Sequence, residues 1–248
     1  MSLTVKLALT PLLVAQALLT RARLPRLPEA GGERHGTLGS AKSPPLRLLV
    51  AGDSSAAGVG VVHQREALAG QLTARLAQAC GARVEWRLVA ASGLTTAQTL
   101  HRLQREALPC FDVAVIVTGV NDVVDQVPSH HAVSAREGLA NWLRNALGVQ
   151  HVVFAPLPPV HAFPGLPQPL RWVAGSDARR HDRALARWAA TRRDVSRVEF
   201  TMPLDRRAMA EDGFHPGEPV YRSTAEAIAQ HIASQVWPLI TTEKRHGQ

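Results

Sequence analysis

A serine stands where an apolar run of residues gives way to small ones. Residues 46–50 read Leu-Arg-Leu-Leu-Val, which is typical of a strand buried on both faces of a sheet. The chain continues Ala-Gly-Asp-Ser-Ser-Ala-Ala-Gly, so Ser54 lies in a turn at the carboxyl end of that strand, where open α/β sheets bind ligands. We therefore consider Ser54 a candidate nucleophile. The alternative is a serine that only caps the next helix.

A serine hydroxyl is a poor nucleophile unless a base takes its proton. The sequence Asp212-Gly-Phe-His215 offers that base near the other end of the chain. His215 is the residue that we expect to accept the proton, and Asp212 is placed to orient the imidazole and stabilise its charged form. The alternative is that His215 is a surface histidine before a proline.

Acyl transfer also needs donors for the oxyanion that forms on the substrate. Gly93 and Asn121 follow two further predicted strands, and their backbone N–H and side-chain amide join the N–H of Ser54 as candidate donors. A turn glycine and a helix-capping asparagine are the alternatives. The nucleophile comes early in the chain and lacks the G-x-S-x-G elbow, which argues against the α/β-hydrolase fold.

The elements around these residues alternate between strands and helices. Strands are predicted at 46–50, 84–90, 112–117, 151–155 and 197–200. Helices are predicted at 68–80, 95–108, 131–147, 176–191 and 219–237. This alternation predicts a parallel sheet covered on both faces. Because the carboxyl ends of parallel strands share one edge, we expect the candidate residues to converge there.

The order of these blocks resembles that of the SGNH hydrolases, the GDSL esterase/lipase superfamily. The matching positions are Gly52-Asp53-Ser54, Gly93, Gly119-Val120-Asn121-Asp122 and Asp212-Gly213-Phe214-His215. Ser55 replaces the leucine of the GDSL name, and the resemblance spans residues 46–237.

The resemblance implies an α/β fold, a three-layer α/β/α sandwich with a flavodoxin-like parallel sheet of about five strands. It implies a serine esterase that works through an acyl-enzyme on small-molecule or lipid esters, without a metal or other cofactor. The triad would be Ser54, Asp212 and His215, and the oxyanion hole Ser54, Gly93 and Asn121. Two rival functions stay open: an acyltransferase using the same site, and a non-catalytic, membrane-docked binding protein.

Four further side chains are predicted to shape the substrate pocket. Phe163 and Trp172 belong to the proline-rich segment 156–172, which follows the fourth strand on the catalytic edge. His63 follows the Ser54 turn, and Phe214 lies inside the last block. Such loops often line sites, although they also serve as plain surface crossings.

Composition and organisation suit one globular domain of 248 residues, 46% of them hydrophobic. We predict an N-terminal apolar segment and Pro/Gly-rich linker over 1–45, the hydrolase domain over 46–240 and a tail over 241–248. Cys80 and Cys110 have no metal-ligand spacing; two separate buried thiols are expected, with a disulfide as the alternative.

The net charge and the N-terminal segment indicate which binding partners to expect. The formal net charge is +8, and arginine bias or an anionic partner would explain it. Nucleic acid is not expected as a partner, because motifs for it are missing and aromatic residues are few. Basic residues follow the apolar run 3–19, so we expect an uncleaved segment that docks on the domain or contacts a membrane through residues 1–26. The alternative is a cleaved signal peptide. We expect a cytoplasmic or membrane-associated protein rather than a secreted one.

Overall fold

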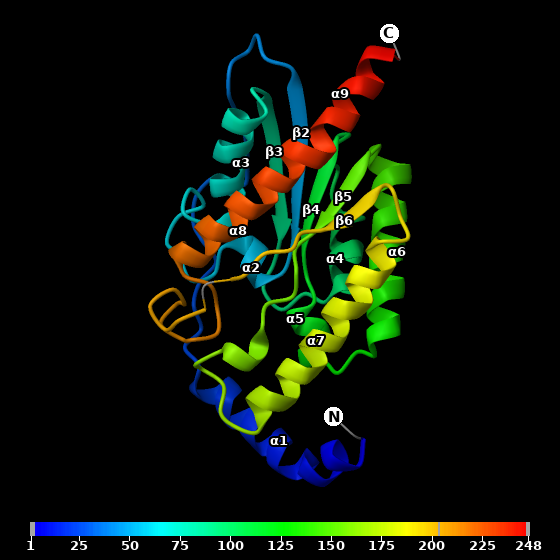
Figure 1. Ribbon diagram of the computed structural model, residues 1–248. Coiled ribbons are helices and arrows are strands. Elements are labelled where there is room, and N and C mark those ends of the chain that lie inside the picture. Colours follow the sequence, from blue (N-terminus) through cyan, green and yellow to red (C-terminus); the bar gives the residue numbers. More distant parts are fainter. Residues whose placement is uncertain (1–2, 203, 247–248) are drawn as a thin grey trace.

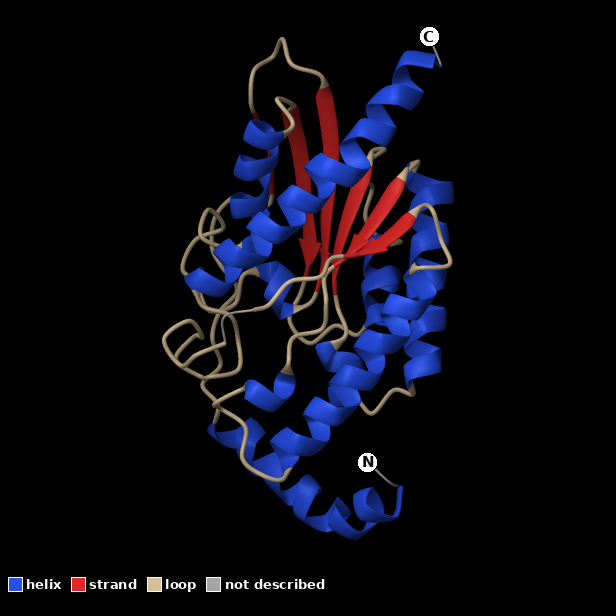
Figure 2. Cartoon of the chain, in the orientation of Figure 1, coloured by secondary structure: helices blue, strands red, loops and turns tan. Residues whose placement is uncertain are grey.

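The computed structural model describes residues 3–202 and 204–246, and its centre is a six-stranded sheet. The strand order is β1-β3-β2-β4-β5-β6, and only β1 is antiparallel to its neighbour (Figures 1 and 2). The bounds are β1 His35–Leu38, β2 Pro45–Gly52, β3 Arg83–Ala90, β4 Val113–Val117, β5 His151–Phe154 and β6 Val195–Arg197. The five parallel strands match the prediction, with the last one two residues earlier than expected.

Helices cover both faces of this sheet. The helices α3 (Leu68–Ala79) and α8 (Glu218–His231) lie on one face, and α4 (Thr96–Leu103), α6 (Ser129–Leu147) and α7 (Leu170–Ala189) cover the other (Figure 1). Along β2, Leu48 and Val50 pack into the first core while Leu49 and Ala51 pack into the second. This two-sided burial is why β2 is apolar without alternation. The predicted α/β/α sandwich is confirmed.

Two short helices turn the chain at the carboxyl edge of the sheet. They are α2 (Ser54–Ala57) after β2 and α5 (Val120–Val124) after β4. Helix α4 ends at Leu103, earlier than predicted, and a loop leads on to β4. A 3-10 turn (Val160–Ala162) follows β5. Helices α2 and α5 and this 3-10 turn lie at the end of the sheet to which the strand arrows point (Figure 2).

The closing helix continues past its predicted end at residue 237. Helix α8 passes through a π-helical turn (Ile232–Val236) into α9 (Trp237–His246). Ile228, Ile232 and Val236 are buried against the sheet, as their spacing predicts. Residues 241–246, which we expected as a tail, therefore continue the closing helix.

The N-terminal segment begins as helix α1 (Leu3–Arg23), and the linker predicted after it is more than a connector. β1 lies within that stretch and pairs with β3. Upstream of β1, the Ala30 N–H donates to the carbonyl of Ala57 at 3.3 Å, and the buried Gln64 amide donates to the carbonyls of both residues. The proline and glycine content indicated a linker, but backbone hydrogen bonding to the domain decides the structure here.

The structure also shows the state and the burial of the two cysteines. Cys80 and Cys110 are both free thiols; burial raises the pKa of Cys80 to about 11, whereas Cys110 is exposed, contrary to the buried thiol expected. Cys110 lies in the surface loop before β4, where packing does not cover it.

Among the described helices, none is long and apolar enough to cross a membrane.

We expect the boundary of the folded domain to lie after α1. A chain that starts at residue 25 should keep the stability of the full chain, because it keeps β1 and the bonds of Ala30. A chain that starts at residue 43 should lose at least about 2 kcal/mol of unfolding free energy, since each buried hydrogen bond contributes roughly 1 kcal/mol. Urea unfolding of both truncated chains measures this difference. Equal stability would show that residues 25–42 are only a linker.

Candidate active site

The turn after β2 presents Ser54 at the first position of α2. Gly52 has a φ of +155°, and a Cβ there would come within 2.0 Å of the carbonyl oxygen of Val117 on β4, so only glycine fits. Asp53 caps the helix, accepting a hydrogen bond from the Ser55 N–H at 2.9 Å. As the first helical residue, Ser54 has a backbone N–H without an acceptor inside the helix. The turn thus exposes the hydroxyl and the N–H of Ser54 together.

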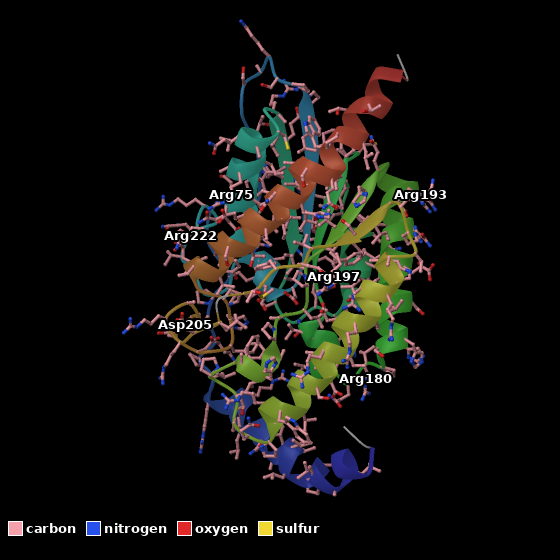
Figure 3. The ribbon with its side chains drawn as sticks, in the orientation of Figure 1. Arg75, Arg180, Arg193, Arg197, Asp205 and Arg222 are labelled. Carbon is pink, nitrogen blue, oxygen red and sulfur yellow. The ribbon has the colours of Figure 1, made fainter. Side chains whose placement is uncertain are left out.

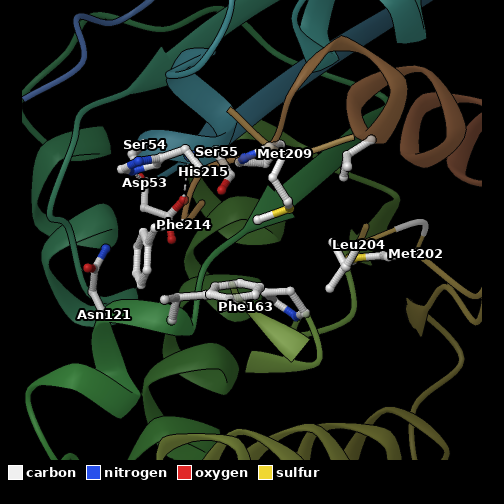
Figure 4. Close-up of a pocket in the computed structure, with 14 residues that line it drawn as sticks. Asp53, Ser54, Ser55, Asn121, Phe163, Met202, Leu204, Met209, Phe214 and His215 are labelled. Carbon is white, nitrogen blue, oxygen red and sulfur yellow. Dashed lines mark hydrogen bonds between the residues drawn. The ribbon is translucent and has the colours of Figure 1, made fainter. Parts of the chain in front are cut away.

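Ser54, His215 and Asp212 form a hydrogen-bonded chain. The Ser54 Oγ lies 3.1 Å from the His215 Nε2 (Figure 4). The His215 Nδ1 lies 2.6 Å from the Asp212 Oδ2. Residues 161 apart in the sequence are brought together because β2 and the segment before α8 both end at the same edge of the sheet. This is the arrangement in which an imidazole takes a proton from a serine while a carboxylate orients the ring.

Asp212 has its hydrogen bonds supplied by its own loop. Its Oδ1 accepts from the backbone N–H groups of Phe214 and His215, each at 2.9 Å. Burial alone would raise the pKa of Asp212, but the bonds from the His215 ring and from these N–H groups lower it below its usual value. The carboxylate therefore stays charged beside the imidazole.

Asn121 and Gly93 lie on neighbouring loops that are tied to each other. The Asn121 side chain lines the same pocket as Ser54 and donates one amide hydrogen to the carbonyl of Leu94 at 3.0 Å (Figure 4). Gly93, the residue before Leu94, is exposed, and nothing lies within 4 Å of where its Cβ would be. The open space leaves its backbone approachable, although Gly93 is not among the residues that line the pocket.

The part of the chain that contains Ser54, Asn121 and His215 identifies the protein family. The sequence profile of the GDSL-like lipase/acylhydrolase family matches residues 50–222, well over half of the sequence. The chain belongs to the GDSL-like lipase/acylhydrolase family. It is therefore a carboxylic ester hydrolase of the SGNH type, a class that acts on small-molecule esters.

Solved structures share the fold of this GDSL-family hydrolase. The lipase Lip_vut3 from a goat rumen metagenome aligns with a TM-score of 0.60 at 18% identity, over 76% of this chain and 97% of that one. TesA gives a TM-score of 0.56 at 22% identity, over 75% and 97%. Axe2, an acetylxylan esterase from Geobacillus stearothermophilus, gives 0.58 at 18% identity, over 80% and 97%. No curated protein matches the sequence.

The pocket of this GDSL-family chain is polar at one end and apolar at the other. Ser54, His215 and Asn121 form the polar end. Phe163 packs edge-on against Phe214 at 5.3 Å between ring centroids, and Phe214 packs in the same way against the His215 ring at 5.2 Å (Figure 4). Two of the four predicted pocket residues, Phe163 and Phe214, therefore line it.

The other two predicted pocket residues lie elsewhere. His63 is exposed in the loop after α2, which folds back onto residues 30–32 and bridges Gly31. Trp172 is exposed on the first turns of α7. The sequence analysis missed the apolar residues that do line the pocket: Val120, Pro158, Met202, Leu204, Met209, Pro216 and Val220. Four of these seven residues lie between β6 and α8. The long connection that contains the Asp212 block was the signal in the sequence that could have pointed to them.

A second buried acid lies close to the His215 ring. Asp53 is almost fully buried, which raises its pKa to about 7; the Ser55 N–H and the positive charge that His215 can carry offset part of this rise. No group of three or more His, Cys, Asp or Glu within the described residues is placed to hold a metal ion.

A buried charge pair lies between the loops that contain Gly93 and Asn121. Asp122, next to Asn121, accepts from the backbone N–H of Thr96 at 3.0 Å and from its hydroxyl at 2.6 Å. Arg136 of α6 donates to the same carboxylate at 3.4 Å, and both charged side chains are almost completely buried. Burial lowers the pKa of Arg136, and Asp122 partly offsets the effect. Gly119 packs on the guanidinium, since a Cβ there would lie 2.6 Å from it.

Removing one member of this pair should destabilise the protein strongly. Asp122→Ala leaves Arg136 buried without its carboxylate, which is expected to lower the free energy of unfolding by about 3–5 kcal/mol. Asp122→Ala combined with Arg136→Met should recover part of that loss, because no charge stays buried. Glu218→Ala, which breaks the exposed pair with Arg222, is the matched control and should cost less than about 1 kcal/mol. Denaturant unfolding gives all three values, and a double variant no more stable than Asp122→Ala contradicts the prediction.

Proposed function

We propose that this hydrolase cleaves carboxylic esters through an acyl-enzyme formed on Ser54, with His215 as base and Asp212 as the residue that orients it. The observation that carries the proposal is the 3.1 Å contact between the Ser54 Oγ and the His215 Nε2. It lies within the range required of a nucleophile and its base. Asp212 on the far nitrogen holds the ring with Nε2 directed at the serine.

The chemistry proceeds in two halves. His215 takes the hydroxyl proton as the Ser54 Oγ attacks the ester carbonyl, and the charge on the carbonyl oxygen is met by the N–H groups of Ser54 and Gly93 and by the Asn121 amide. The alcohol leaves with the proton held by His215. Water then attacks the acyl-enzyme in the same way and releases the acid. Asn121 has two amide hydrogens, so its bond to the Leu94 carbonyl leaves one for the oxyanion.

The pocket favours small acyl groups. Its cavity has a volume of about 40 Å³, a few times the roughly 10–15 Å³ that a single water molecule needs on the same measure. Longer chains enter only if the lining side chains move, and Met202 and Met209 are the flexible ones among them. Among the structural neighbours, Axe2 is described as an acetylxylan esterase. We therefore propose an ester of a short acyl group as the substrate class.

The role of Ser54 is tested by Ser54→Ala with Ser55→Ala as the matched control. On p-nitrophenyl acetate, Ser54→Ala should lose turnover by roughly a million-fold, the usual effect of removing a triad nucleophile. Ser55→Ala should keep most of it, because the bond of Ser55 to Asp53 comes from the backbone N–H. A fluorophosphonate probe should label the wild type on Ser54. Substantial turnover by folded Ser54→Ala protein would place the nucleophile elsewhere.

The role of Asn121 is tested by kinetics and stability on one variant. Asn121→Ala should lower kcat about a hundred- to a thousandfold with little change in KM, because its amide acts on the oxyanion and not on the bound ester. Loss of the bond to Leu94 adds a stability change of about 1 kcal/mol. Asn141→Ala, on α6 away from the pocket, should leave kcat unchanged. A variant of Asn121 that loses only stability would make this residue structural.

A further inference from the structure

Helix α1 exposes large apolar side chains to an unusual degree. Leu7, Val14 and Leu18 are 63%, 52% and 65% exposed. Leu12 and Leu19 of the same helix are 47% and 53% exposed. Half of the strongly exposed large hydrophobic residues identified in the described part of the chain therefore lie on this one helix. Clustered exposure of this kind marks an interaction surface, whereas isolated exposed apolar residues need no explanation.

The helix has one side against the protein and an apolar side away from it. Leu9, Leu13, Gln16 and Thr20 follow each other at steps of three and four residues and are all partly buried. At 100° per residue, Leu7, Val14 and Leu18 lie on the opposite side of the helix. We call these three residues the outer stripe. The inner side of α1 packs on the protein, whereas the apolar outer stripe is exposed. An exposed apolar stripe of this kind suits a binding partner outside the chain.

Helix α1 is held in place by a polar contact with the start of α7. The Gln16 Nε2 donates to the carbonyl of Gln168 at 2.7 Å, and the Gln16 Oε1 accepts from the N–H of Leu170 at 3.0 Å. The same amide thus fixes which side of the helix faces the protein. Trp172, two residues further along α7, is 44% exposed beside this contact. An indole at such a place suits the boundary between water and lipid.

The charged residues of α1 and of the five residues after it have one sign. The first 28 residues contain no aspartate or glutamate, and Arg21, Arg23 and Arg26 at the end of the helix and just after it are exposed. Elsewhere the positive charge is spread widely, with Arg75, Arg180 and Arg222 on three different helices (Figure 3). The whole molecule is therefore attracted to an anionic surface, and α1 is where basic and apolar side chains occur together.

The position of α1 relates this surface to the pocket. The helix lies beyond the carboxyl ends of the parallel strands, at the end of the molecule that carries the loops with Ser54 and Asn121 (Figures 1 and 2). It is not long and apolar enough to cross a bilayer. A helix of this kind lies in the plane of the interface, with its apolar side among the acyl chains and its arginines at the headgroups.

We propose that α1 binds the surface of an anionic phospholipid bilayer through the outer stripe and its neighbouring arginines, and so holds the catalytic end of the molecule toward the membrane. This role is separate from the proposed ester hydrolysis. The apolar side supplies depth of insertion and the basic residues supply the preference for anionic lipid. A second copy of the chain would cover the apolar stripe equally well but would meet the same positive charges, so the charge favours lipid.

The test is flotation of the full chain with vesicles of phosphatidylcholine alone or mixed with phosphatidylglycerol. The variant Leu7→Ser/Val14→Ser/Leu18→Ser removes the outer stripe, and Leu38→Ser/Val62→Ser is the matched control, because it removes exposed apolar side chains from β1 and the loop after α2. Arg21→Gln/Arg23→Gln tests the charge. Circular dichroism and turnover on p-nitrophenyl acetate confirm that each variant is folded and active.

Wild type and the control variant should float with the mixed vesicles, at least about tenfold more than with phosphatidylcholine alone, and less at high salt. The outer-stripe variant should lose binding by on the order of a hundredfold, and the arginine variant by about tenfold. The proposal is overturned if wild type does not float, or if the outer-stripe variant floats as wild type does. It is also overturned if sedimentation shows a dimer that the outer-stripe substitutions dissociate while vesicles are not bound.

Discussion

The site of this hydrolase depends on a carboxylate that takes no part in the chemistry. Asp122 is buried among the loops that follow β3 and β4 and the helix α6, and it is bonded to all three. Its bonds to Thr96 fix the loop that contains Gly93, and its neighbour Asn121 reaches the same loop at Leu94. A charge removed from water is tolerated only when it is paired and hydrogen-bonded. The need to satisfy Asp122 therefore holds together the two loops that supply proposed oxyanion donors.

Three aspartates near the pocket show how the surroundings decide what a carboxylate does. Asp212 is buried, but its own loop supplies two N–H groups and the imidazole supplies a third donor, so its pKa falls. Asp53 lies deeper in the protein than Asp212 and receives the N–H of Ser55, and burial prevails, so its pKa rises to about 7. Asp122 is paired with a guanidinium. Of the three, Asp212 has the charge and the position that suit it to stabilise an imidazolium.

The N-terminal part of the chain has a different relation to the fold. Residues 29–38 are tied to the domain, since Glu29 accepts from the Ser92 N–H and hydroxyl next to Gly93, and β1 extends the sheet. Helix α1 is hydrogen-bonded to the start of α7 through Gln16, and its outer stripe is exposed. The loop of Gly93 is thus braced by the segment before β1, whereas α1 is free to serve a partner outside the protein.

The sequence by itself determined the central architecture and the residues that converge. Uninterrupted apolar runs such as 113–117 require burial on both sides, and strands alternating with helices require parallel connections. Ser54, Asn121 and His215 could therefore be placed on one edge of the sheet from the sequence. The Asp-x-x-His spacing is also local, because a single turn brings the carboxylate to the ring. These conclusions rest on short-range patterns, which a sequence displays directly.

Only the tertiary structure decided what depends on contacts between distant segments. The strand at 35–38 exists because β3 offers it an open edge, although its own residues read as a linker. His63 and Trp172 lie outside the pocket, and Met202 and Met209 lie in it, because loop paths are set by packing and not by local composition. The pairing of Asp122 with Arg136 likewise joins a loop to a helix that no motif connects to it. Burial and hydrogen bonding across the chain decided each of these, and they are properties of the folded molecule alone.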